Sequence, residues 1–137
     1  MSEIITAADE ITTVIRTVNG AECAVLDLVP EMDLDQVRNL QIVVTPQGKT
    51  RTNQGGANRA TPERTVKVNI AIMKRLQNKN QIPDMLNLAE AVEKSIERRR
   101  IGNGIVTHVE MDPIYDTEVF RRCKVFIAVM TANIKGF

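Results

Sequence analysis

Apolar and polar residues follow one spacing from Arg64 to Arg75 and a different one from Pro83 onwards. From Arg64 to Arg75 they alternate, which is typical of a half-buried β-strand. The expected buried face of this strand is Val66, Val68, Ile70 and Ile72. From Pro83 onwards apolar residues recur at i, i+4, i+7 and i+11, which predicts an amphipathic helix with Pro83 in its first turn. The run Arg98–Arg100 and then Gly102 predict the end of that helix.

The N-terminal third predicts one helix and two strands. Apolar residues at helical spacing from Ile4 to Val18 indicate a packing helix, which Asn19-Gly20 would end. The apolar run Cys23–Val29, followed by a proline, predicts a first strand. A second strand is expected at Leu40–Thr45, closed by Pro46, and its continuous Ile-Val-Val favours a position inside the sheet.

The C-terminal third predicts two further strands. The first spans Gly104–Met111 and is expected to carry His108 on its surface. After a loop to about Thr117, the second is expected over Val119–Met130, with apolar residues on both faces. The tail 132–137 has no evident core role, and we expect it to dock on the body or on a neighbour.

Residues 47–62 form the least regular segment of the sequence. They include three glycines, no large apolar residue and only positive charge, from Lys49, Arg51 and Arg59. Such a composition cannot build a core, and loops of this length inside compact domains are usually functional or disordered. We therefore expect a long polar arm at the tip of a hairpin.

The order of predicted elements is helix, strand, strand, long arm, strand, helix, strand, strand. This order predicts an α+β fold with an antiparallel or mixed sheet of about four to five strands flanked by two helices. At 137 residues the chain is expected to form a single domain, 1–137, with a flexible polar arm at about 47–62.

Composition excludes several classes of protein. The apolar fraction of 43% and the charged fraction of 26% are ordinary for a soluble globular protein, and the net charge is +1. No apolar run is long enough to span a membrane, so no membrane partner is expected. Aromatic residues make up 3% of the chain, which argues against a base-stacking surface for single-stranded nucleic acid.

Charges of opposite sign are separated along the chain. Residues 1–35 contain eight acidic residues against one arginine, a net charge of −7. Residues 36–83 contain nine basic residues against one glutamate, a net charge of +8. Either charged residues on solvated faces happen to segregate, or the acidic side of one subunit meets the basic side of a neighbour.

Candidate catalytic groups are few. His108 is the only histidine, and Cys23 and Cys123 lie in apolar runs, so we expect two buried reduced thiols. The acidic segment 31–38 lacks the glycine and distal glutamate of an EF-hand loop and is interpreted as a solvated loop. Gly48-Lys49-Thr50 lacks the earlier glycine and following helix of a phosphate-binding loop. We expect no enzyme activity, no cofactor and no metal.

The order and spacing of elements resemble those of the small tail terminator proteins of long-tailed bacteriophages, and more loosely other head–tail joining proteins. The resemblance spans almost the whole chain and is a pattern of elements, without a diagnostic motif. Its points of similarity are the N-terminal helix, a strand near Val25, an acidic turn with Leu34 leading into Leu40–Pro46, a polar insertion, the strand Thr65–Lys74, a helix from Asp84 and the paired C-terminal strands.

The resemblance implies a structural role in the virion. Tail terminators close into a ring, typically of six subunits, on the last ring of the tail tube, stop its polymerisation and dock the head. The expected partners are further copies of this chain, the tail tube protein, the head–tail connector protein and DNA passing through the ring. The expected location is the head–tail junction of the virion, after assembly in the host cytoplasm.

The residues expected at subunit interfaces come from the two charged regions of the chain. The basic set is Lys49, Arg51, Arg59 and Arg64, and the acidic set is Glu31, Asp33 and Asp35. Heterologous contacts between unlike surfaces close into rings at a fixed rotation. The alternatives are another head–tail completion or tail-tube subunit, and a nucleic-acid-binding module that uses the basic arm.

Overall fold

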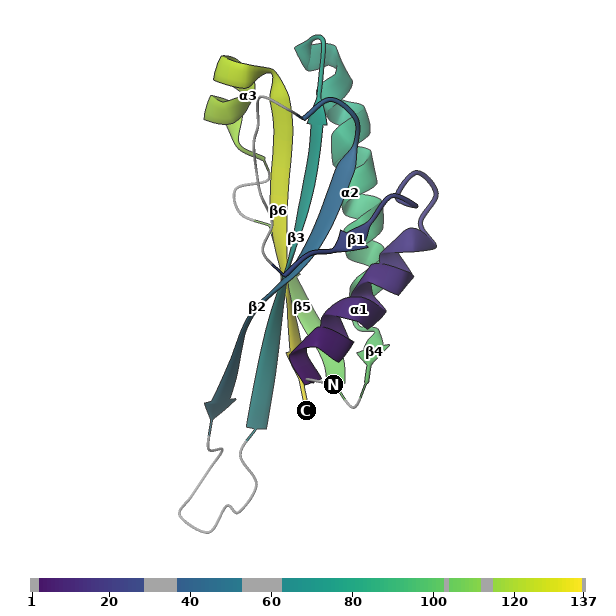
Figure 1. The fold of residues 1–137 in the computed structure, drawn as a ribbon, viewed down its shortest axis with the longest axis vertical. Coiled ribbons are helices and arrows are strands. Elements are labelled where there is room, and N and C mark those ends of the chain that lie inside the picture. Colours follow the sequence, from purple (N-terminus) through teal and green to yellow (C-terminus); the bar gives the residue numbers. More distant parts are fainter. Residues whose placement is uncertain (1–2, 29–36, 53–62, 103, 112–114, 137) are drawn as a thin grey trace.

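The fold is α+β, as predicted, and is built on one mixed sheet (Figure 1). The computed structural model describes residues 3–28, 37–52, 63–102, 104–111 and 115–136. Its strands lie in the order β1-β2-β3-β6-β5-β4. The helices of the described part are α1 (Glu3–Arg16), α2 (Ile82–Ile96), α3 (Thr117–Cys123) and the short 3-10 turn η2 (Lys79–Gln81). The strands are β1 (Val25–Leu26), β2 (Gln41–Thr52), β3 (Glu63–Arg75), β4 (Arg100–Ile101), β5 (Gly104–Glu110) and β6 (Val125–Lys135).

Strand β3 lies in the middle of the sheet, between β2 and β6. Its pairing with β6 runs without a break from Thr65↔Lys135 to Arg75↔Val125. The predicted buried face is confirmed, because Val66, Val68, Ile70 and Ile72 are all fully buried in the main core. The alternating pattern predicted this strand because its two faces meet different surroundings.

Helices α1 and α2 cover the same face of the sheet (Figure 1). The buried stripe of α1 is Ala7, Ala8, Ile11, Thr12 and Ile15, and that of α2 is Ile82, Met85, Ala89, Val92 and Ile96. Both follow the helical spacing read from the sequence. We call the face under these helices the core face and the opposite one the outer face.

The end of α2 differs from the prediction. The helix stops at Ile96, and Arg98 follows in the left-handed region with φ of 60°. Arg98 and Arg99 then exchange backbone hydrogen bonds with Val106, so this segment is held against β5 instead of continuing the helix. Gly102, predicted as the helix stop, adopts φ of 59° after β4.

The predicted strand from Val119 to Met130 is wrong in its first part, which forms the helix α3. Asp116 caps this helix, since its Oδ1 accepts a hydrogen bond of 3.1 Å from the Val119 backbone N–H. The helix ends at Lys124, which has φ of 60°, and β6 starts at the next residue. Val119 and Cys123 are four residues apart, a spacing that fits a helix as well as a strand.

The prediction that residues 132–137 have no core role is also wrong. Strand β6 continues to Lys135, where it pairs with both β3 and β5. Ala132, Asn133 and Ile134 are buried there. The tail is therefore an interior strand of the sheet for most of its length.

Strand β2 runs beyond Pro46, which was expected to close it. The register of the β2–β3 pair shifts between Pro46 and Gly48, and pairing then continues to Thr52↔Glu63. This irregularity accommodates a residue that has no backbone N–H to donate. Residues 47–52, predicted as part of the arm, are thus a strand, and 53–62 lie outside the described residues. The single-domain organisation stays a prediction.

The predicted strand Cys23–Val29 is reduced to the two residues of β1, which pair in parallel with Val43 and Val44. Cys23 is exposed before this strand, and Cys123 is half-buried at the end of α3. The expectation of two buried thiols is therefore wrong. Both cysteines are free.

Candidate assembly surface

Among the described residues, the outer face of the sheet is covered at one end only. There, Val119 of α3 and Val37 pack against Ala71, Met73 and Val125 in a small second core. Further along the same face, towards Thr65 and Lys135, the strands present their side chains without a covering helix in the described part of the chain (Figure 1). An uncovered sheet face is the feature of this fold that is available for assembly.

One apolar row crosses this outer face. Val25, Val43, Ala71 and Val129 are successive register partners on β1, β2, β3 and β6. The two ends of the row are exposed, with 47% of Val25 and 42% of Val129 accessible. Within the described residues, Ile105 on β5 adds a third exposed apolar side chain, placed opposite Lys135. Exposed β-branched side chains aligned across a sheet favour contact with another protein surface.

Polar residues form the next two rows. Asn69 and Thr131 are register partners, and the Thr131 hydroxyl donates a 3.0 Å hydrogen bond to Asn69 Oδ1. Asn133 and His108 are partners in the row beyond, where Asn133 Nδ2 lies 3.2 Å from His108 Nε2. Lys67 completes that row on β3. One hydrogen bond within each row, Thr131–Asn69 and Asn133–His108, holds these polar side chains in place.

His108 also contacts a carboxylate. Its Nε2 lies 3.0 Å from Glu110 Oε1, and the side chain is 52% exposed. The same nitrogen can accept from Asn133 when unprotonated or donate to Glu110 when protonated, but it cannot do both at once. The prediction that His108 is a surface residue of a strand is confirmed. A histidine on an open sheet face is not set in a cleft for acid–base chemistry.

The structure describes only some of the predicted interface residues. Lys49 and Arg51 lie on β2, where their backbones pair with Val66 and Arg64 respectively. Arg59 and the acidic set Glu31, Asp33 and Asp35 lie outside the described residues. The contact between the basic set of one subunit and the acidic set of the next stays a prediction.

Arg64 has a partner within its own chain. Its Nη1 lies 3.5 Å from Glu3 Oε1 on α1, and both side chains remain partly exposed. The register pairs the backbones of Arg51 and Arg64, so two basic residues share this position of the hairpin. Glu3 therefore offsets part of the positive charge at this end of the hairpin.

The charge separation read from the sequence is carried by two different parts of the fold. Strands β2 and β3 contain six basic residues against one acidic residue, a net charge of +5. Residues 3–28, which include α1 and β1, contain five acidic residues against one basic residue, a net charge of −4. The subunit thus has a basic hairpin and an acidic N-terminal region.

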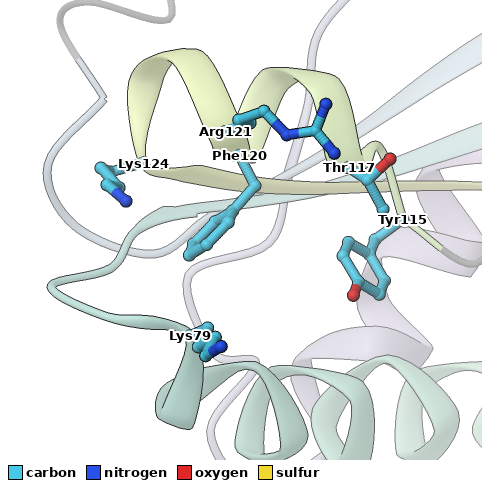
Figure 2. A pocket seen from close by; sticks show the side chains of 6 residues that line it. All are labelled: Lys79, Tyr115, Thr117, Phe120, Arg121 and Lys124. Carbon is cyan, nitrogen blue, oxygen red and sulfur yellow. The ribbon is translucent and has the colours of Figure 1, made fainter.

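A pocket of about 270 Å³ lies between α3 and η2 (Figure 2). Its lining residues are Lys79, Tyr115, Thr117, Phe120, Arg121 and Lys124. The Lys124 ammonium lies 5.5 Å from the centroid of the Phe120 ring, a cation–π distance. This pocket could not be predicted from the sequence, because α3 itself was not predicted and its residues are distant in sequence from Lys79.

The described part of the chain contains neither a cluster of metal-binding side chains nor a membrane-spanning helix. No group of three or more histidine, cysteine, aspartate or glutamate side chains is placed there to hold a metal ion. None of its helices is both long enough and apolar enough to cross a membrane.

The fold is similar to that of two chains from solved structures. One belongs to the virion of a native gene transfer agent particle, with a TM-score of 0.54, 11% identity, and coverage of 98% of this chain and 96% of that chain. The other is a sheath/tube terminator of an extracellular contractile injection system in its extended state, with a TM-score of 0.51 and 11% identity. That match covers 98% of this chain but 57% of the terminator chain.

The likeness is one of fold. No protein-family model and no curated protein matches the sequence. The predicted resemblance to tail terminators is therefore confirmed as a terminator-like fold over nearly the whole chain.

Proposed function

We propose that this chain is a structural virion protein, a tail terminator that closes as a ring on the end of the tail tube. The ring stops tube polymerisation and forms the surface on which the head docks. The observation that carries the proposal is the match of 98% of the chain to the fold of a sheath/tube terminator. A match of the same extent to a chain of a gene transfer agent virion supports a role in a phage-like particle.

The outer face supports assembly with other subunits. Val25 and Val129 expose apolar side chains on a row whose centre, Ala71, is already buried. A neighbour placed on this face would remove these valines from water, a gain of about 25 cal/mol for each Å² of apolar surface buried. The polar rows beside them would fix its orientation through hydrogen bonds.

The charges support a head-to-tail arrangement within the ring. The basic hairpin of one subunit, with Lys49, Arg51, Arg59 and Arg64, would face the acidic N-terminal region of the next, residues 3–28. Such complementarity selects the orientation of the partner more than it adds affinity. Contacts between unlike surfaces close into a ring at a fixed rotation. Six subunits is the number that the resemblance to tail terminators implies.

The partners follow from this position in the particle. The tail tube protein would lie on one side of the ring and the head–tail connector protein on the other, with DNA passing through the centre. The chain would act at the head–tail junction after assembly in the host cytoplasm. It would be a structural component and not an enzyme.

Electron microscopy of the chain mixed with the tail tube subunits of its particle tests the role, with the native mass of the purified chain measured alongside. We expect rings of one size at the ends of tubes. Subunits incorporated along the whole tube would indicate a tube protein, and binding to the head connector alone would indicate a head-completion protein. Filter binding of DNA at two salt concentrations tests the remaining alternative, since a nucleic-acid-binding module would bind tightly and lose affinity steeply with salt.

A further inference from the structure

The pocket between α3 and η2 holds more positive charge than the described chain neutralises. Lys79 and Lys124 form no ion pair with any described residue, whereas Arg121 pairs with Glu118 at 2.8 Å. That pair is exposed on both sides, so it is weak and can exchange partners. Figure 2 shows the three basic side chains coming from η2 and from α3 and its C-terminal end. An anionic group in the pocket would be attracted by all three.

The remaining wall of the pocket is Thr117 and the two aromatic rings of Tyr115 and Phe120. Tyr115 stacks on the fully buried ring of Phe126, with centroids 5.5 Å apart and an angle of 27° between the rings. Phe120 is half-buried beside it and packs on the main core. Because the core fixes these rings, the pocket offers a preformed apolar surface next to its cations. A volume of about 270 Å³ suits a few side chains and not a nucleic acid duplex.

We propose that this pocket binds an acidic peptide segment that also carries apolar side chains, and that residues 31–35 of a neighbouring copy supply it. That segment reads Glu-Met-Asp-Leu-Asp, so it brings three carboxylates for three cations and two apolar side chains for the aromatic wall. The source of the segment rests on the proposed ring, which places a second copy beside each subunit. The chemistry of the pocket does not depend on the ring.

Fluorescence anisotropy with a labelled peptide of residues 29–37 tests the inference on the full chain. The receptor is a chain carrying Glu31→Gln, Asp33→Asn and Asp35→Asn, so that its own segment does not compete. We expect saturable binding that weakens as salt rises. A peptide with the same three neutral substitutions serves as the matched control and should not bind.

Two pairs of substitutions in the receptor locate the site. Lys79→Ala with Lys124→Ala should weaken peptide binding by about threefold to thirtyfold, because ion pairs at exposed lysines are weak and two are lost together. Lys94→Ala with Lys135→Ala removes the same charge from exposed positions outside the pocket and should leave binding unchanged. Equal binding by both double variants, or no binding at all, would overturn the inference.

Two further results would also overturn it. A labelled single-stranded oligonucleotide that binds the pocket in place of the peptide would assign it to nucleic acid. The peptide could also bind the native chain more than tenfold more weakly than the receptor with the three neutral substitutions. That result would mean that residues 31–35 of each chain occupy the pocket of the same chain. Tube capping is measured separately, so capping without peptide binding removes only the pocket inference, and peptide binding without capping removes only the proposed function.

Discussion

Asn133 on β6 and His108 on β5 stand opposite each other on the outer face, with Asn133 Nδ2 3.2 Å from His108 Nε2. Asn133 is only 5% exposed, although it lies on the part of the outer face that no described helix covers. Its neighbours on β3 and β5 therefore shield it, and the His108 contact satisfies its amide. The pair links the two strands at the centre of the proposed assembly surface.

Asn133→Ala should lower the free energy of unfolding by about 1–2 kcal/mol, because a buried amide loses its hydrogen bonds and packing. Urea denaturation followed by circular dichroism measures this change. His108→Ala should cost less than about 0.5 kcal/mol, since water can replace the exposed imidazole. Equal losses for both variants would contradict the burial of Asn133.

Ile134→Ala should be more costly, about 2–5 kcal/mol, because Ile134 is fully buried between β3 and β5. The same denaturation experiment measures the effect. Lys135→Ala, at the next and exposed position, is the control and should change stability by less than about 0.5 kcal/mol. A stability unchanged by Ile134→Ala would mean that the C-terminal residues lie outside the core.

Most regular elements of this fold could be predicted from the sequence, since their two faces meet different surroundings. Strand β3 and helices α1 and α2 each bury one face and expose another, so periodicity alone indicated them. Helix α3 could not be separated from a strand, because only Val119 in it is buried. Its cap, Asp116, was a local signal that the spacing of the apolar residues obscured.

The assembly surface could not be predicted from the sequence, for a different reason. Its rows depend on the order of strands in the sheet and on the register irregularity between Val106 and His108. Neither is encoded in any short segment. The separation of charges could be read directly, but the Arg64–Glu3 pair within one chain could not, since it joins positions 61 residues apart.

Val129→Glu should leave the subunit folded and impair its assembly. The side chain is exposed at the end of the apolar row, so the expected cost in stability is below about 1 kcal/mol. A carboxylate there would be desolvated by a neighbour, which opposes association. Sedimentation velocity with tube subunits measures the effect. Val129→Thr keeps the β-branched shape and should assemble better than Val129→Glu. Equal assembly by the two variants would mean that the outer face is not part of the subunit interface.

The hairpin can be shortened without disturbing its strands. Thr52 and Glu63 are register partners, so an Asn-Gly pair replacing residues 53–62 would join them by a two-residue turn. We expect the shortened chain to unfold at a similar urea concentration and to cap tubes poorly, because Arg59 and the rest of the arm are lost. Restoring the ten residues with Arg59→Ser alone separates the arginine from the arm. Full capping by the shortened chain would exclude an assembly role for residues 53–62.

The length distribution of tail tubes polymerised with increasing amounts of this chain, measured by negative-stain electron microscopy, tests the terminator role most directly. If the chain caps tubes, mean tube length falls as the ratio of chain to tube subunit rises, and a ring is visible at tube ends. Tubes of unchanged length, with no added density at their ends, would contradict the role.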